Sequence, residues 1–137
     1  MEFNFNEMKP EDLIEYVKPH SDVSSQDYEV EEFFWQFMNV SIKELLEKNK
    51  NGTDENGWLE WIDIEQKGRL SEWGYDSVQQ ITEYWLENPE KEPIIAARTE
   101  DGKIEIWDGY HRFGIAIRNK LKNVPVILGE IIHNKIH

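Results

Sequence analysis

In the first 90 residues the hydrophobic positions recur mainly at helical spacing. Residues 9–17 (KPEDLIEYV) place Pro10 in a first turn that is followed by acidic residues, which predicts a short helix. Residues 18–27 are polar and predict a loop. In residues 28–38 the apolar side chains lie three and four positions apart, which predicts an amphipathic helix built on Val30, Phe33, Phe34 and Phe37.

The next segments combine helix signals with one clear loop. Ser41 and Glu44 form a capping-box pattern at the start of a helical segment, residues 41–49. The Asn- and Gly-rich residues 49–57 predict a loop, and residues 58–65 fit a short helix or an irregular segment. Residues 76–88 predict a helix with Asp76 as its cap and one apolar row made of Val78, Ile81 and Trp85.

The last third of the chain has a different pattern, with short alternating runs. Residues 93–99 and 104–107 predict two strands, joined by the Asp-Gly turn of residues 100–103 into a hairpin. A helix over residues 110–122 and a strand over 123–133 follow, with Asn123 expected in the left-handed conformation where the helix stops.

These elements predict an α/β fold of the mixed α+β type in one domain, residues 1–137. Its parts are a helix-rich acidic region, residues 1–90, and a β-β-α-β core, residues 92–133.

Charge is distributed unevenly along the chain. The formal net charge is −13, and because residues 101–137 carry +2, the first 100 residues carry −15. Non-specific DNA binding depends on Lys and Arg that neutralise phosphates, so we expect no direct DNA binding. An acidic body fits a solvated surface, a basic protein partner or a nucleic-acid mimic.

The absence of cysteine excludes disulfides, thiolate catalysis and zinc–thiolate sites. The first 15 residues are acidic and contain no apolar run of the signal-peptide kind, and no segment approaches the ~18 apolar residues of a membrane span. We therefore expect a cytoplasmic protein with no membrane contact.

The segment EIWDGYHRFGIAIRNK, residues 105–120, holds the candidate chemistry. A helix begins near Gly109, yet its first turn carries His111 and Arg112, although cations favour the other end of a helix. The free first-turn amides and the helix dipole form an anion site, and a bound phosphate would make both cations favourable. A purely structural reading fits equally well: Asp108 caps the helix, Gly109 turns the chain, and the two cations face solvent.

Together with the strands around it, this segment resembles the ParB/sulfiredoxin-like superfamily. Members typically show a strand, a Gly-x-(His/Arg)-Arg segment that opens a helix, and a strand with a VPV-like stretch. The resemblance covers residues 92–128, and the matching positions are Asp108, Gly109, His111, Arg112, Phe113, Gly114 and Ala116. It implies a small mixed sheet with flanking helices.

The resemblance also implies nucleotide binding, with ATP or CTP and Mg²⁺ as expected cofactors. Phosphates in such relatives lie over the turn that corresponds to Gly109, Tyr110, His111 and Arg112. Phosphoryl transfer or nucleotide hydrolysis would follow, with Asp108 and His111 as candidate catalytic residues that hold Mg²⁺ or accept a proton. Tyr110 stands where sulfiredoxin has its catalytic cysteine, so that reaction is excluded.

Other groups of residues favour structural roles. His133 and His137 fit an incidental tail better than a metal site, and His20 fits a solvated loop better than a contact with the nucleotide. The acids Glu60, Asp63 and Glu65 fit a solvated face better than a Mg²⁺ site, and the tryptophans Trp58, Trp61 and Trp73 fit a core better than a stacking platform. The competing function is an acidic interaction protein, such as an antitoxin, an immunity protein or a phage-type inhibitor, with a vestigial pocket.

Overall fold

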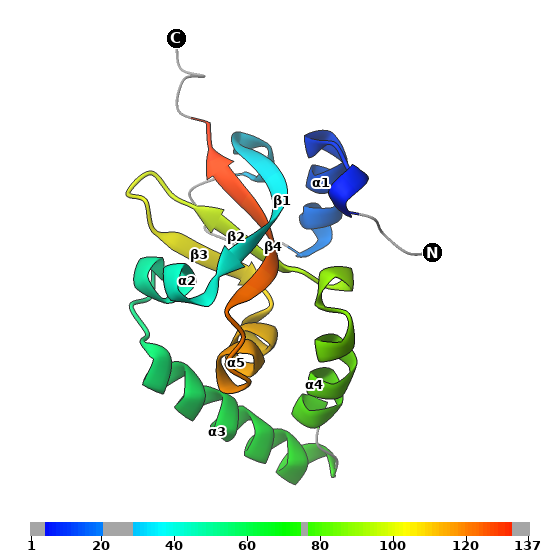
Figure 1. Ribbon diagram of the computed structural model, residues 1–137, viewed down its shortest axis with the longest axis vertical. Helices are drawn as coiled ribbons and strands as arrows, with labels where there is room; N and C mark the ends of the chain where they lie inside the picture. Colours follow the sequence, from blue (N-terminus) through cyan, green and yellow to red (C-terminus); the bar gives the residue numbers. More distant parts are fainter. Residues whose placement is uncertain (1–4, 21–28, 75–76, 133–137) are drawn as a thin grey trace.

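A four-stranded mixed sheet lies at the centre of the fold (Figure 1). The computed structural model describes residues 5–20, 29–74 and 77–132. The strand order is β1-β4-β2-β3; β4 is antiparallel to β1 and parallel to β2, and β2 is antiparallel to β3. The strands are β1 (Phe33–Ser41), β2 (Ile94–Arg98), β3 (Ile104–Asp108) and β4 (Asn123–Ile131). The predicted α/β class, in its mixed α+β form, is confirmed.

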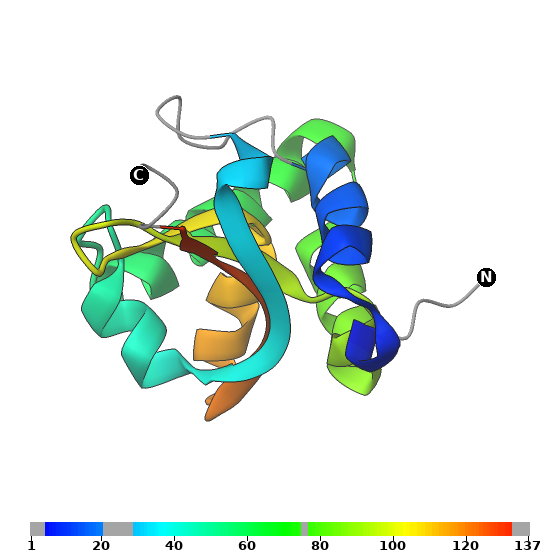
Figure 2. The same cartoon turned by 90° about the horizontal axis from the view of Figure 1, so that it is seen from above.

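Helices cover both faces of this sheet. Seen from above, α1 lies on the opposite side of β1 from α2 and α5 (Figure 2). The α-helices are α1 (Pro10–Val17), α2 (Ile42–Lys48), α3 (Glu55–Trp73), α4 (Ser77–Glu87) and α5 (Tyr110–Arg118). Short 3-10 turns accompany them in the described residues: η1 (Phe5–Glu7), η2 (Lys18–His20), η3 (Val30–Glu32) and η4 (Pro89–Lys91).

The sheet is buried on both faces, so consecutive residues of a strand serve different cores. In β2, Ile94 and Ala96 pack with the larger cluster, which α2, α3, α4 and α5 cover, whereas Ile95 and Ala97 pack with the cluster that α1 covers. All four residues are at most 1% exposed. A strand of this kind is a continuous apolar run rather than an alternating one.

The predicted helix over residues 28–38 is wrong. In the described part of this segment, residues 29–38, only Val30–Glu32 is helical, as a 3-10 turn. The chain then forms β1, the nine-residue edge strand paired along its whole length with β4. Phe33 and Trp35 point into the core under α1, and Val40 points into the other one. Because β1 has apolar residues on both faces, these residues recur three and four positions apart, as they would in a helix.

A close approach between strands fixes the position of Trp35. Its ring is fully buried against Gly129 of β4, its partner in the strand register, and its indole N–H donates to the Val30 carbonyl at 2.9 Å. A Cβ atom built on Gly129 would lie 2.8 Å from two atoms of that ring. Glycine is therefore required where these two strands meet.

The loop predicted over residues 49–57 is shorter, and the helix after it is much longer than expected. Asp54 accepts a hydrogen bond from the Gly57 amide at 2.8 Å and caps α3, which runs for 19 residues to the left-handed Gly74. In the first half of α3, Trp58 and Ile62 are deeply buried. The polar second half carries little apolar periodicity, so the pattern could not predict its length.

Most other predicted elements are confirmed. The helix at residues 9–17, the Ser41 cap of α2, the helix with Val78, Ile81 and Trp85, and the hairpin of β2 and β3 all form. Helix α5 ends at Arg118 rather than at residue 122, and the left-handed residue after it is Lys120 (φ 57°), not Asn123, which begins β4. The predicted cap Asp76 lies outside the described residues, as does most of the loop at residues 18–27.

Candidate functional site

The turn between β3 and α5 depends on glycine for two separate reasons. Gly109 is the N-cap of α5 with φ 109° and ψ 25°, a conformation that residues with a Cβ rarely adopt. A Cβ there would lie 3.1 Å from both Ile94 Cγ1 and Arg112 Nη2. The Gly109 carbonyl accepts the Phe113 amide at 2.8 Å, so the amides of residues 110–112 begin the helix without intrahelical acceptors.

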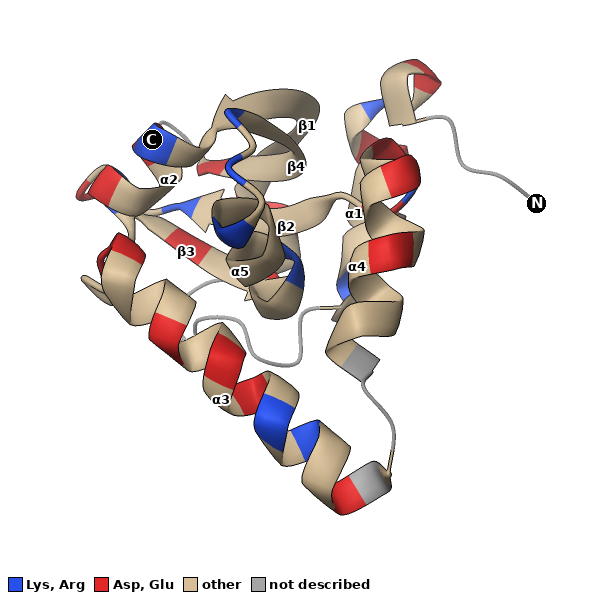
Figure 3. Cartoon of the chain, turned by 60° about the horizontal axis from the view of Figure 1, so that its bottom comes forward, with Lys and Arg blue, Asp and Glu red and all other residues tan. Residues whose placement is uncertain are grey.

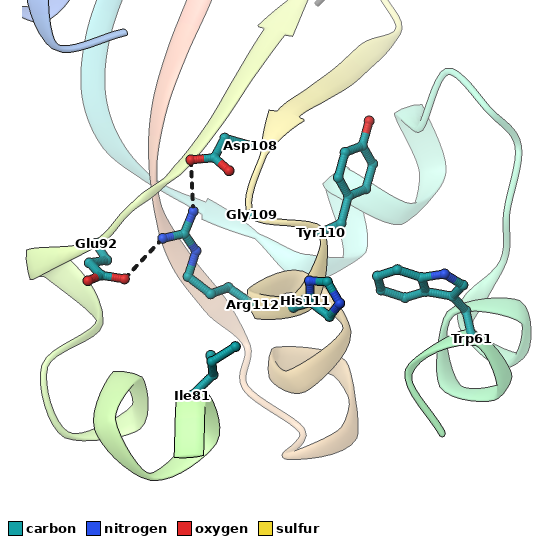
Figure 4. Close-up of a pocket in the computed structure, with 8 residues that line it drawn as sticks. All are labelled: Trp61, Ile81, Glu92, Asp108, Gly109, Tyr110, His111 and Arg112. Carbon is teal, nitrogen blue, oxygen red and sulfur yellow. Dashed lines mark hydrogen bonds and ion pairs between the residues drawn. The ribbon is translucent and has the colours of Figure 1, made fainter. Parts of the chain in front are cut away.

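A pocket of about 370 Å³ opens in front of this turn (Figure 4). All five residues of the Asp-Gly-Tyr-His-Arg segment line it, together with one residue each from α3, α4 and the segment after η4. The lining residues are Trp61, Ile81, Glu92, Asp108, Gly109, Tyr110, His111 and Arg112. Every predicted site residue therefore lines one pocket. Its other walls, polar and apolar, come from distant parts of the chain.

Arg112 is held between two carboxylates in this pocket. Its Nη2 lies 3.3 Å from Asp108 Oδ2 and its Nη1 lies 3.3 Å from Glu92 Oε2, and the side chain is only 14% exposed. These partners explain how a cation is tolerated at the start of α5 in the absence of an anion. The distances exceed the roughly 2.7–2.9 Å of strong charge-assisted hydrogen bonds, so both contacts are long. Sequence reasoning missed Glu92, which lies 20 residues away in the chain.

His111 has an acidic partner as well. Its Nε2 lies 2.9 Å from Glu65 Oε1 and 3.1 Å from Arg69 Nη2, and its ring centroid lies 5.0 Å from that of Trp61. One ring nitrogen either donates to the carboxylate or accepts from the guanidinium, so the His111 tautomer selects between the two contacts. The reading in which His111 and Arg112 face solvent without partners is therefore wrong, and so is Asp108 as the cap, because Gly109 holds that position.

The N-terminal helix also reaches this site. His20 Nδ1 lies 3.3 Å from Asp108 Oδ2, and the His20 ring centroid is 5.1 Å from that of Tyr16. Burial raises the pKa of Tyr16; Arg112 lowers it, and the carboxylates of Glu92 and Asp108 raise it further. His20 is exposed, as predicted, and does not line the pocket, but this contact connects it to Asp108.

Tyr110 points away from the two cations, toward α3. Its hydroxyl donates to the Ile106 carbonyl at 2.6 Å, and its ring is stacked with that of Trp58 at a centroid distance of 6.1 Å and an interplanar angle of 19°. Burial raises the pKa of Tyr110, and the Glu105 carboxylate adds to that rise. The phenol therefore stays protonated near neutral pH.

Of the remaining candidate residues, Trp61 lines the pocket and Glu65 pairs with the pocket residue His111, while the others lie away from this pocket or outside the description. Among the described residues no group of three or more His, Asp or Glu could hold a metal ion. Glu60 and Asp63 are exposed, whereas Glu65 is half-buried and pairs with His111. Trp58 is buried in the core as predicted, and the side chain of Trp73 lies outside the description, as do His133 and His137.

Comparisons of the chain with protein-family models, with curated proteins and with solved structures gave no match. The ParB/sulfiredoxin-like resemblance therefore stays a prediction. In the described ranges, no helix combines the length and the apolar character that crossing a membrane requires.

Proposed function

We propose that the protein binds a nucleoside phosphate, ATP or CTP, with its phosphates over Gly109, in the manner expected of a ParB/sulfiredoxin-like domain. One observation carries this proposal: the five residues 108–112 line a single pocket at the N-terminus of α5. The proposal includes the cytoplasmic location that the sequence predicts.

The chemistry of the turn suits phosphate oxygens. Free amides at a helix start attract anions. Arg112 offers a planar fork whose present contacts are long, so a phosphate can compete for it with Asp108 and Glu92. Trp61 and Ile81 supply apolar surface on the other side of the pocket.

The carboxylates of Asp108 and Glu92 would repel a phosphate that binds without a cation. Mg²⁺ commonly uses one or two carboxylates together with substrate phosphates, and Asp108 and Glu92 fit that role. When bound, it would neutralise charge between the carboxylates and the phosphates. If the protein is an enzyme, Asp108 and His111 line the pocket as proton acceptors for an attacking hydroxyl or water, which corresponds to phosphoryl transfer or hydrolysis.

Thermal unfolding with ATP, ADP and CTP, each with and without Mg²⁺, tests this proposal. Nucleotide at ~100 times its Kd adds about 2.7 kcal/mol to stability, which raises the Tm by roughly 9 °C for a chain of this length. Arg112→Ala should abolish the shift. Arg118→Ala should keep it, because Arg118 pairs with Asp63 at the far end of α5. If no nucleotide shifts the wild-type Tm, the proposal is wrong.

A second candidate function is binding of a basic protein by the acidic region. Two observations favour it: both cations of the turn already have carboxylate partners, and α3 exposes Ile64 (66%) and Leu70 (51%) on a helix that carries several acids (Figure 3). Binding of a basic protein that survives Arg112→Ala but is lost on Glu60→Lys with Asp63→Lys would support this function instead.

A further inference from the structure

Tyr110 lines two further pockets besides the one at Gly109. A second pocket of about 370 Å³ shares Trp61 and Tyr110 with the first, and a third of about 220 Å³ shares Asn51 and Tyr110 with the second. The second is lined by Asn51, Thr53, Gly57, Trp58, Trp61 and Tyr110. A ligand that extends from the turn past Trp61 and Tyr110 would enter this second pocket.

The walls of the second pocket suit a flat aromatic group. Trp58 and Trp61 come from α3 and meet nearly at right angles, with ring centroids 5.6 Å apart, and Tyr110 is stacked with Trp58. Stacking on aromatic side chains is the common way in which proteins hold nucleobases. The loop before α3 adds amide and hydroxyl groups through Asn51 and Thr53.

Two buried donors beside Tyr110 lack acceptors. Within residues 29–74 and the other described ranges, Trp58 Nε1 and Asn49 Nδ2 have no hydrogen-bond partner, although the two residues are only 4% and 5% exposed. The Asn49 Oδ1 atom accepts the Asn51 amide at 3.2 Å, which holds this side chain in the loop. Trp58 lines the second pocket and Asn49 the third. Buried donors are normally paired, so these two mark places for acceptor atoms of a ligand.

We propose that the pocket between Asn51, Thr53 and the aromatic side chains Trp58, Trp61 and Tyr110 is the base subsite of the nucleotide. The base stacks against the half-buried rings of Trp61 and Tyr110 and presents a carbonyl or ring-nitrogen acceptor to Trp58 Nε1, while the phosphates lie at Gly109. The inference rests on the proposed function, because it requires a nucleotide. It assigns to α3 the recognition of the base and to α5 that of the phosphates.

The experiment compares whole nucleotides with a ligand that has no base. Binding of ATP, CTP and inorganic tripolyphosphate, each with Mg²⁺, is measured by calorimetry on wild type, Thr53→Phe and Thr53→Ser. Thr53 is half-buried and lies outside the turn, so the phenyl group fills the second pocket only. We expect at least one nucleotide to bind wild type ten-fold or more tighter than tripolyphosphate. Thr53→Phe should remove that advantage without changing tripolyphosphate affinity, and Thr53→Ser should keep it.

The outcomes separate this inference from the proposed function. If neither tripolyphosphate nor any nucleotide binds, both are wrong. If nucleotides bind in an Arg112-dependent way but no tighter than tripolyphosphate, or keep their advantage in Thr53→Phe, only the base subsite is wrong. Unchanged tripolyphosphate binding shows that the variant is folded. As a second readout, the indole N–H resonance of Trp58, assigned by its loss in Trp58→Phe, should shift with nucleotide and stay in place with tripolyphosphate.

Discussion

Replacing Gly109 by alanine should destabilise the protein more than the same change at another glycine of positive φ. Gly109 has φ 109°, where a Cβ is strained, and the new methyl group would also lie 3.1 Å from Ile94 Cγ1 and Arg112 Nη2. Ile94 is fully buried and cannot move aside. The Arg112 head group is held by Asp108 and Glu92, so moving it weakens two ion pairs.

The magnitude follows from these two contributions. Backbone strain of this kind costs about 1–3 kcal/mol, and an extra methyl group in a packed site costs about 1 kcal/mol or more. Gly102 provides the matched control, because its φ is 82° and a Cβ there would meet nothing within 4 Å. The loss of stability in Gly102→Ala therefore comes from backbone strain alone. We expect Gly109→Ala to lose at least ~1 kcal/mol more than Gly102→Ala.

Urea unfolding followed by tryptophan fluorescence measures both free energies. For a chain of this length, a difference of 1 kcal/mol corresponds to a Tm difference of roughly 3–4 °C, so thermal unfolding gives an independent value. Equal losses for the two variants would refute the packing of Ile94 and Arg112 around the turn. A smaller loss at Gly109 would refute the strained conformation as well.

Three further predictions concern stability. Gly129→Ala should cost about 2 kcal/mol in urea unfolding because its Cβ would meet the Trp35 ring at 2.8 Å, and the cost should shrink in a Trp35→Phe background; an unchanged cost would contradict that contact. Ser41→Ala should cost about 1 kcal/mol through loss of the cap that accepts the Glu44 amide, and no loss in urea unfolding would mean that the cap contributes nothing. Burial raises the pKa of Tyr16 and Tyr110 in the folded protein, whereas the unfolded chain ionises near 10.0. Stability should therefore fall as the pH rises above that value, by less when both are Phe, as urea unfolding between about pH 9 and 11 would show.

The sequence predicted the elements whose pattern has one interpretation. The hairpin of β2 and β3 has an Asp-Gly turn between two β-rich runs, and α4 has a single apolar row, so both were predictable. In β1, by contrast, Phe33 and Trp35 face one core and Val40 the other. Spacing alone cannot separate such a strand from a helix, although the aromatic run FFWQF favours a strand by propensity.

The candidate site was predictable at the turn and not around it. Residues 108–112 are contiguous, so their chemistry is visible in the sequence. Glu65, Glu92 and His20 reach the same place only through tertiary packing, and each is one acid or histidine among many in the chain. The prediction did not include these partners, so it gave a pocket with two free cations. The structure pairs both cations with carboxylates.

The central position of β4 has a consequence for how the protein folds. Phe33 of β1 pairs with Ile131 of β4, roughly 100 residues later, and β2 also needs β4 for its parallel neighbour. Among the pairings of the four described strands, only the β2–β3 hairpin joins residues that are close in the sequence. Closing these long loops costs entropy before any strand pairing forms, and this cost slows folding. We therefore expect folding in milliseconds to seconds rather than microseconds. Until β4 is in place, β1 and β2 expose the apolar faces that the two cores later bury.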